Sequence, residues 1–306
     1  MIRQIVAFHG KMGSGKDTAA TYLINRLQTI QFPNLSTCKE VSIHQVSFAE
    51  ALRRSLCYLL SRSPNYRIDY ENTLSETDKA QIIPAFALKD VDMNKEFLHL
   101  FNNSWNAVLK IQRQELDGDL EKKIAQSVKI FTSLIQTNQC TIGKALQILG
   151  TEIGRNIWDE NLWVKLALHQ ICNYFATPSR SEYLFTIITD LRFPNEYHAL
   201  THFDPTIVTR PTLIVFIDAT QRLSLKDKKN QGRDVKHASE TMLPLDPTNS
   251  HLKIIDNNST LENFFSNLDQ HFQTSIFDFI LKRKQVHNTS FVILLILVFL
   301  FLLCWC

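Results

Sequence analysis

Short apolar stretches alternate along the chain with longer stretches whose apolar residues recur at helical spacing. The short stretches are rich in β-branched residues and almost continuously apolar, which predicts strands buried on both faces. Strands that alternate with helices predict an α/β fold with a parallel, doubly wound sheet, whose ligands bind at the carboxyl ends of the strands. The predicted strands span residues 4–8, 41–48, 184–189, 213–218 and 252–256.

Residues 49–175 contain no convincing strand pattern, and we expect a helical insertion over about 50–175, after the second strand. One polar stretch in it, 64–95, carries no recognisable motif. Residues 264–280 predict another amphipathic helix near the C-terminus. The helices predicted within the insertion span 50–61, 96–112, 121–136 and 144–172.

A glycine-rich loop, GKMGSGKDT at residues 10–18, ends the first predicted strand and leads directly into a helix-forming stretch. In this context Gly-x-x-x-x-Gly-Lys binds phosphate, because glycines let backbone N–H groups turn inward and the helix N-terminus adds partial positive charge. We expect Lys16 to lie against the β- and γ-phosphates of a nucleoside triphosphate; a glycine-rich turn without a ligand is the alternative. The expected ATP-binding residues are Gly10, Gly13, Ser14, Gly15, Lys16, Asp17 and Thr18.

The residue after Lys16 distinguishes this loop from the commonest form. Many GTPases and ATPases place a Ser or Thr ligand of Mg²⁺ there, whereas this chain has Asp17 followed by Thr18. A carboxylate so close to phosphates repels them unless a hydrated Mg²⁺ lies between. Small-molecule kinases use this variant, which favours a kinase over a switch or a motor.

Composition and charge narrow the class of protein. With 306 residues, 44% hydrophobic and 21% charged, the chain is expected to fold around one core with a smaller appendage. The net charge of +3 gives no electrostatic reason to expect nucleic-acid binding. The six cysteines include no Cys-x-x-Cys pair and indicate free thiols in a reducing compartment. We expect no signal peptide, because the first strand begins almost at Met1.

The C-terminal residues 291–306 (FVILLILVFLFLLCWC) are entirely apolar. As a helix they would span about 24 Å, somewhat less than the ~30 Å hydrocarbon core of a bilayer. The basic residues 282–284 just before them fit a cytoplasmic flank. We expect a transmembrane tail anchor after a linker helix, 273–290, with the alternative that the tail packs on the protein or a partner.

Four further stretches could place charged groups around a transferred phosphate, which needs several cations, Mg²⁺ and exclusion of water. FAEALR leaves the second strand and contains Arg53, and KALQILGTEIGR carries polar side chains at helical spacing. ITDLRFPNE ends the third strand with Asp190 and Arg192. RDVKHASE follows a basic segment that could form a lid over about 220–240.

Each of these stretches also has a purely structural interpretation. Asp190 could cap the next helix and pair with Arg192. Gln147, Glu152 and Arg155 could form a surface salt-bridge face, and His237 and Glu240 could be surface groups. His198 and His202 lack a third metal ligand. Trp158 and Trp163 fit the core better than a stacking platform.

Taken together, the motifs resemble the phage-type deoxynucleoside monophosphate kinases, a branch of the P-loop kinases. The resemblance covers about residues 2–270 and rests on six blocks in order: GKMGSGKDT, SFAEALR, KALQILGTEIGRNIWDENLWVKLAL, ITDLRFPNE, HASETMLP and IIDNNSTLENFF. It implies a three-layer P-loop kinase fold with a five-stranded parallel sheet in the order 2-3-1-4-5, a helical acceptor-binding insertion and a lid. A C-terminal hydrophobic helix is not part of the family pattern.

The resemblance also implies roles for single residues. Lys16 and the loop hold ATP, Thr18 approaches the α-phosphate, and Asp17 and Asp190 hold hydrated Mg²⁺ through water. Lys16, Asp17, Asp190 and Arg192 form the expected catalytic set. Lys144 stands where related chains often have Arg, which puts bidentate phosphate binding there in doubt. The expected acceptor-binding residues are Arg53, Lys144, Gln147, Thr151, Glu152 and Arg155, with Arg192 as a further cation, and the lid residues are Arg233, His237 and Glu240.

We therefore expect residues 1–272 to form a kinase domain that uses ATP and Mg²⁺ to convert deoxynucleoside monophosphates to diphosphates. The cytosolic domain would be tethered by its tail to an intracellular membrane. A kinase of another small phosphate, such as phosphomevalonate, and a non-catalytic membrane-anchored nucleotide-binding protein are the alternatives. A homodimer is left open.

Overall fold

The computed structural model describes residues 1–11, 13–29, 41–62, 79–109, 116–137, 139–179, 181–227, 252–278 and 280. The chain divides into two compact units, which are described separately. The first unit consists of Met1–Ala7 and Leu35–Thr212, and the second of Phe8–Asn34 and Leu213–Cys306.

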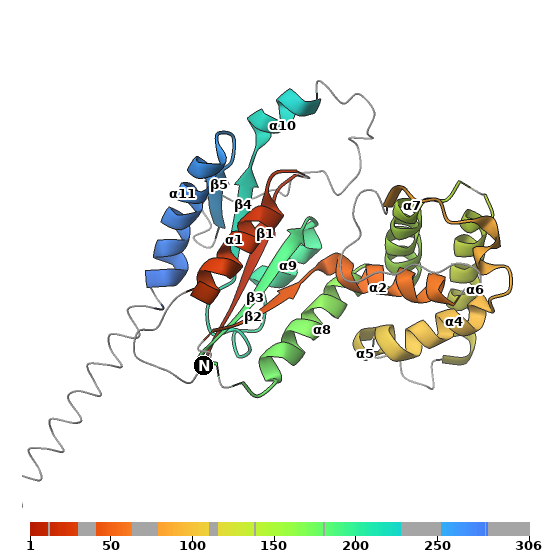
Figure 1. Ribbon diagram of the computed structural model, residues 1–306. Helices are drawn as coiled ribbons and strands as arrows, with labels where there is room; N and C mark the ends of the chain where they lie inside the picture. The colour runs from red at the N-terminus through yellow and green to blue at the C-terminus, as the bar shows by residue number, and fades with distance from the viewer. Residues whose placement is uncertain are drawn as a thin grey trace, which may run out of the picture. The chain divides into compact units, whose positions relative to one another are not determined.

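The strands form a five-stranded parallel sheet in the order β2-β3-β1-β4-β5, as predicted (Figure 1). Two of the five predicted ranges match the observed strands at both ends, and the others differ by one to two residues. The strands are β1 (Ile2–His9), β2 (Val41–Val46), β3 (Tyr183–Leu191), β4 (Leu213–Asp218) and β5 (Leu252–Asp256).

In the first unit, β2 pairs with β3 in parallel register from Val41 opposite Tyr183 to Val46 opposite Ile188. β3 is buried along most of its length, as its apolar sequence requires, because helices cover a parallel sheet. Two helices of this unit, α2 (Phe48–Ser61) and α8 (Leu162–Ala176), contact each other. A short helix, α9 (Pro194–Thr201), follows β3.

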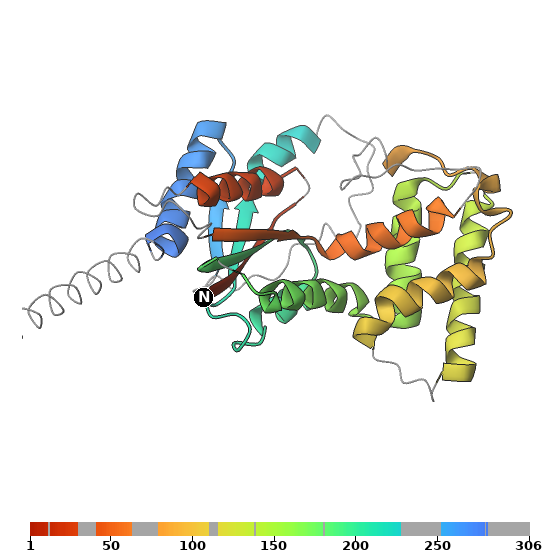
Figure 2. The same ribbon diagram turned by 60° about the horizontal axis from the view of Figure 1, so that its bottom comes forward.

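The predicted insertion is helical, and its helices gather beside α2 in Figures 1 and 2. Its core is strongly aromatic: the Trp105 ring packs edge-on against Trp158 and Trp163, at centroid distances of 5.1 and 5.9 Å. Trp158 and Trp163 are therefore core residues, as their sequence context suggests. The insertion contains η1 (Ala85–Leu88), α4 (Met93–Leu100), η2 (Phe101–Trp105), α5 (Asn106–Leu109), α6 (Leu116–Ile135), α7 (Ile142–Gln147) and η4 (Ile148–Trp158).

The prediction of one helix over 144–172 is wrong. The chain forms α7, then the π-helical segment η4, and leaves the helical conformation at Asp159, whose φ is −166°. The Asp159 carboxylate accepts hydrogen bonds from the Asn161 backbone N–H at 2.7 Å and from Lys165 Nζ at 2.6 Å. Such side-chain bonds compete with helix continuation, so α8 begins anew at Leu162.

In the second unit, α1 (Lys16–Thr29) and α11 (Leu261–Phe272) lie side by side, and α11 also contacts β5 (Figure 1). Tyr22 donates a hydrogen bond of 2.7 Å to Asp269, which joins the two helices. Burial and this bond raise the pKa of Tyr22 to about 12. The remaining elements are α10 (Thr220–Asp227) and η6 (Gln273–Phe277).

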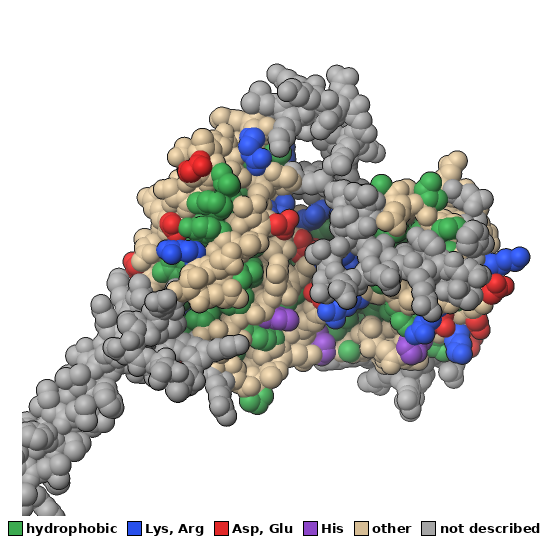
Figure 3. Space-filling model, viewed as in Figure 1, with side chains coloured by type: hydrophobic (Ala, Val, Ile, Leu, Met, Phe, Trp, Pro, Cys, Tyr) green, Lys and Arg blue, Asp and Glu red, His purple; other side chains and the backbone are tan. Residues whose placement is uncertain are grey.

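Several sequence predictions fall outside the described residues. They are the lid residues Arg233, His237 and Glu240 and the apolar run 291–306. Within the part of the chain that the structure describes, no helix is long and apolar enough to cross a membrane. On the face shown in Figure 3, basic and acidic side chains of the described residues are interspersed.

Candidate functional site

The glycine-rich loop of the second unit has the backbone conformation that a phosphate loop needs. Gly10, Gly13 and Gly15 have φ angles of +148°, +74° and +101°, which side-chain-bearing residues rarely adopt. A Cβ on Gly10 would lie 2.7 Å from the Ile217 carbonyl oxygen. The loop therefore depends on glycine for both its conformation and its close packing.

Lys16, the first residue of α1, is buried against this loop. Its side-chain Nζ donates hydrogen bonds to the carbonyl oxygens of Gly10 at 2.6 Å and Lys11 at 2.8 Å. The nearby hydroxyl of Ser14 is buried and has no hydrogen-bond partner among the described residues. An unpaired buried hydroxyl is costly, and a phosphate oxygen is an acceptor that would satisfy it.

Two residues of the second unit, one in α10 after β4 and one directly after β5, donate hydrogen bonds to backbone carbonyls of the loop. Arg222 Nη2 donates to the carbonyl oxygens of Gly13 at 2.9 Å and Ser14 at 3.2 Å. Asn257 Nδ2 donates to the same Ser14 carbonyl at 2.7 Å. The backbone carbonyl of Asn257 accepts a hydrogen bond from Arg222 Nε at 3.1 Å. These bonds fix the two carbonyls, and the Ser14 N–H donates a further bond of 3.1 Å to the Lys11 carbonyl within the loop. Asp17 and Thr18 are exposed in the first turn of α1.

In the first unit, Asp190 near the end of β3 caps a helix, but not the helix that follows it in sequence. Its Oδ2 accepts bonds from the Ser47 hydroxyl at 2.5 Å and the Ala49 N–H at 3.0 Å, and its Oδ1 accepts the Phe48 N–H at 2.8 Å. These donors lie at the N-terminus of α2, the helix that follows strand β2 in the chain, and β2 pairs with β3. Negative charge at a helix N-terminus is stabilising.

The same cluster includes Arg53. Arg53 Nη2 donates to the Ser47 hydroxyl at 3.0 Å, and Ser47 in turn donates to Asp190. No ion pair joins Arg53, Lys144 or Arg192 to an acidic side chain among the described residues. Cations without acidic partners are available for an anionic ligand. The pairing of Asp190 with Arg192, which was part of the purely structural alternative, does not occur among these ion pairs.

Glu196, in the first turn of α9, is the most buried acid of this region, with 2% of its surface exposed. Its Oε2 accepts hydrogen bonds from the backbone N–H groups of Arg192 at 2.8 Å and Phe193 at 3.0 Å. Burial, and secondly the charge of Asp190, raise the pKa of Glu196 to about 7 against the opposing effects of these bonds and of Arg155. This acid fixes the turn that carries Arg192.

The remaining predicted acceptor residues lie on α7 and η4. Lys144, Gln147, Thr151 and Glu152 are exposed, whereas Arg155 is half-buried. Glu152 accepts a hydrogen bond from Asn156 at 3.2 Å. No hydrogen bond or ion pair of the described residues joins the exposed four to Asp190 or Arg53, so the structure gathers only part of the predicted set.

The sequence missed several residues that shape these sites. Ser47 and Glu196 stand inside motifs that were singled out, but their contacts run to distant segments. Arg222 was part of a basic segment that could form a lid, and Asn257 carried no role. A Ser at the end of a strand and an Asn pair after the last strand were the available signals, and neither is specific.

The five-stranded parallel sheet in the order 2-3-1-4-5 and the glycine loop that leads into α1 are consistent with a P-loop kinase fold. A family model described as deoxynucleotide monophosphate kinase matches residues 4–268, and the chain belongs to this family. It is therefore a phosphotransferase that acts on nucleotides. The chain is also 24% identical over 254 residues, 78% of its length, to the deoxynucleoside-5′-monophosphate kinase of Escherichia phage T5, of which the match covers 85%.

Proposed function

We propose that this protein transfers the γ-phosphate of ATP to the 5′-phosphate of a deoxynucleoside monophosphate, with Mg²⁺, and so makes a diphosphate. The observation that carries the proposal is the phosphate loop, with three glycines at positive φ, a buried lysine and an unpaired buried hydroxyl. The family and the phage T5 relative support a nucleotide as the acceptor rather than phosphomevalonate.

In this proposal the loop of the second unit binds ATP. The loop amides and the Ser14 hydroxyl bind phosphate oxygens, and Lys16 leaves its two carbonyl partners to neutralise the β- and γ-phosphates. Thr18, exposed in the first turn of α1, approaches the α-phosphate. The bonds from Arg222 and Asn257 keep the loop in shape without contacting the nucleotide phosphates.

The first unit would supply the cations for the acceptor. Arg53, Lys144 and Arg192 bind the acceptor phosphate, and the exposed polar face of α7 and η4, with Gln147 and Thr151, faces the nucleoside. The acceptor phosphate is already an anion, so no general base is needed. Positioning and charge neutralisation therefore account for the rate.

Mg²⁺ would be held mainly by phosphates and water. No group of three or more metal-ligating side chains occurs in the described parts of the chain. Asp190 Oδ1 accepts one hydrogen bond, so it has a lone pair left for a metal-bound water, and Asp17 is exposed beside the loop. These residues fit outer-shell roles, in which the ion neutralises charge on the transferred phosphate.

The domain limits, the lid and the membrane tether are part of the proposal on sequence grounds. Residues 1–272 form the catalytic domain, and Arg233, His237 and Glu240 belong to a lid over about 220–240. After a linker, 273–290, the apolar run 291–306 anchors the cytosolic domain to an intracellular membrane. Carbonate extraction of a membrane fraction tests the anchor, because recovery in the soluble wash would exclude an integral tail.

The kinase proposal is tested with Lys16→Ala in an assay of ADP release over a panel of monophosphate acceptors. We expect turnover to fall below about one thousandth of the wild-type rate while the circular dichroism spectrum stays unchanged, since several kcal/mol of charge stabilisation are removed. Lys122→Ala, which removes an exposed lysine of α6, is the matched control and should keep full activity. Wild-type turnover by the Lys16→Ala variant would refute the proposal.

A further inference from the structure

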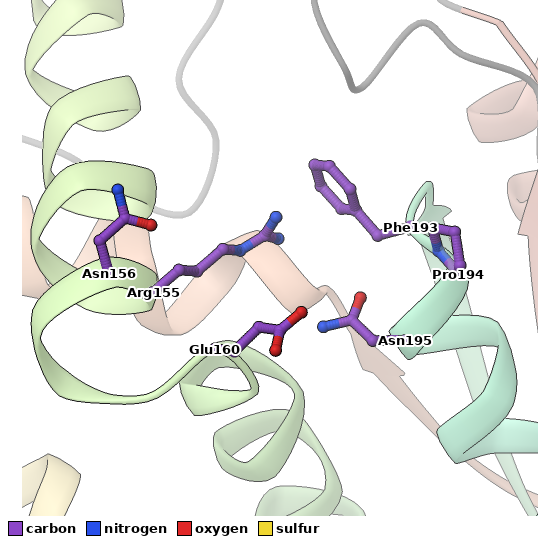
Figure 4. Close-up of a pocket in the computed structure, with 6 residues that line it drawn as sticks. All are labelled: Arg155, Asn156, Glu160, Phe193, Pro194 and Asn195. Carbon is purple, nitrogen blue, oxygen red and sulfur yellow. The ribbon is translucent and has the colours of Figure 1, made fainter.

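A pocket of about 490 Å³ opens in the first unit between the end of η4 and the start of α9. It has the size expected of a small-molecule site. Figure 4 shows the Arg155 side chain extending toward Phe193, with the Glu160 and Asn195 side chains lying below it. The pocket is lined by Arg155, Asn156, Glu160, Phe193, Pro194 and Asn195.

The Arg155 guanidinium is fixed in this pocket but not satisfied by the protein. Its Cζ lies 3.9 Å from the centroid of the Phe193 ring, and Nη2 lies 3.9 Å from Glu196 Oε1. Its side chain is only 20% exposed, yet it makes no hydrogen bond to a described residue. Its N–H groups are therefore open to a ligand that presents acceptors to the pocket.

The carboxylate of Glu160 supplies hydrogen-bond acceptors and a negative charge to the same pocket. It is exposed and forms neither a hydrogen bond nor an ion pair with a described residue, Arg155 included. The Asn195 amide is engaged with the protein on both sides: its Nδ2 donates to Asn161 at 2.9 Å and its Oδ1 accepts the Glu196 N–H at 3.0 Å. Arg155 and Glu160 are therefore the charged groups of the pocket that make no hydrogen bond to a described residue.

We propose that this pocket is the nucleobase subsite of the acceptor and that it selects guanine, with Glu160 accepting N1–H and the 2-amino group and Arg155 donating to O6. The proposal rests on the proposed function. Guanine alone among the four bases presents two adjacent donors next to an acceptor on its pairing edge, and a carboxylate accepts both.

Other ligand groups fit the pocket less well. Adenine, cytosine and thymine each offer the Glu160 carboxylate one pairing-edge N–H group, so one carboxylate oxygen would remain without a donor. The acceptor phosphate is excluded by the Glu160 charge and has the unpaired cations Arg53, Lys144 and Arg192 as better partners. The ring of Phe193 gives the pocket an apolar wall and holds the Arg155 guanidinium, whose N–H groups are then used for O6.

The decisive probe is 2′-deoxyinosine 5′-monophosphate, which differs from the guanine nucleotide only by the absent 2-amino group. We expect the wild-type protein to phosphorylate the guanine nucleotide with a kcat/KM about 10- to 100-fold higher than the inosine nucleotide, as for one hydrogen bond to a charged group. Calorimetric binding of the two nucleotides without ATP should show a preference of the same direction. Equal values for the two nucleotides would overturn the assignment.

Glu160→Gln provides the second arm of the test, because an amide keeps the size but offers one acceptor oxygen in place of two. In this variant the ratio of kcat/KM for the guanine nucleotide to that for the inosine nucleotide should fall to less than about threefold, because kcat/KM for the guanine nucleotide decreases. Glu121→Gln, at an exposed acid of α6, is the control and should keep the wild-type preference. An unchanged ratio in Glu160→Gln would overturn the role of Glu160.

The outcomes separate this inference from the proposed function. If the wild-type protein phosphorylates deoxynucleoside monophosphates without preferring guanine, the subsite assignment fails and the kinase proposal stands. If no monophosphate of the panel is phosphorylated, both fail together.

Discussion

The Ser47 hydroxyl donates a hydrogen bond of 2.5 Å to the carboxylate of Asp190, although the two residues are 143 positions apart. The bond joins the start of α2 to the end of β3, and Arg53 is attached to it through the same hydroxyl at 3.0 Å. An acid that the sequence suggested as a magnesium partner thus also caps a helix and orients a cation.

Ser47→Ala should lower the free energy of unfolding by about 1.5 to 3 kcal/mol, the usual cost of a hydrogen bond to a charged group. It also removes the hydrogen-bond partner of Arg53, so the KM for the acceptor should rise more than the KM for ATP. Urea unfolding and steady-state kinetics measure the two effects. Ser61→Ala, which removes an exposed hydroxyl bonded among the described residues to the Tyr58 carbonyl, should change neither by much.

The raised pKa of Glu196 predicts a dependence of stability on pH. Its pKa is about 7 in the folded protein and near 4.5 in the unfolded chain, so the folded state binds more protons between these values. The free energy of unfolding should therefore fall as the pH rises from about 4.5 to 7, by roughly 3 kcal/mol at most, and this loss should end above pH 7. Urea unfolding at a series of pH values measures it.

Glu196→Gln should remove this contribution to the pH dependence. One oxygen of Glu196 accepts both backbone bonds, from Arg192 and Phe193, and the amide oxygen of Gln can do the same. The variant should hence be at least as stable as the wild type at pH 8. If Glu196→Gln retains the full wild-type slope between pH 4.5 and 7, the assignment of the titration to this residue is wrong.

Arg222→Met should weaken ATP binding through the shape of the phosphate loop. The substitution removes the bonds to the carbonyls of Gly13 and Ser14, and we expect the KM for ATP to rise about tenfold, which corresponds to about 1.4 kcal/mol. The KM for the acceptor should change little, and Arg222→Lys should restore part of the loss. Arg26→Met, which breaks the 3.2 Å pair with Asp269, is the control and should lower stability without affecting KM.

Gly154→Ala should be more destabilising than Gly150→Ala, although both lie in η4. A Cβ on Gly154 would lie 2.5 Å from Trp163 Cζ2, and this buried ring is fixed by its 2.8 Å bond to the Gly150 carbonyl. A Cβ on Gly150 meets only the movable end of Leu52 at 2.9 Å. We expect a loss of about 1 to 3 kcal/mol for Gly154→Ala and less than about 1 kcal/mol for Gly150→Ala by urea unfolding. Equal losses would contradict this packing argument.

Elements with one dominant local signal were predictable from the sequence. The strands at 213–218 and 252–256 have the predicted limits. The first is an apolar run that is buried almost throughout, as expected of a central parallel strand, whereas in the second Lys253 is half-buried and Ile254 is exposed. The predicted helix over 144–172 failed at Asp159, where a side chain bonds to the backbone two residues later. Helical spacing of apolar residues does not report such a local competition.

The glycine loop, its lysine and the strand and helix around it follow from neighbouring residues, and the sequence by itself determined this half of the chemistry. Tertiary structure alone decided the rest: that Asp190 caps α2, that Arg222 and Asn257 hold the loop, and that Arg155 lies on Phe193 in a pocket with Glu160. Each of these contacts joins residues that are distant in the chain or set by the packing of separate helices. Local backbone preference does not predict which distant side chains come into contact when the chain folds.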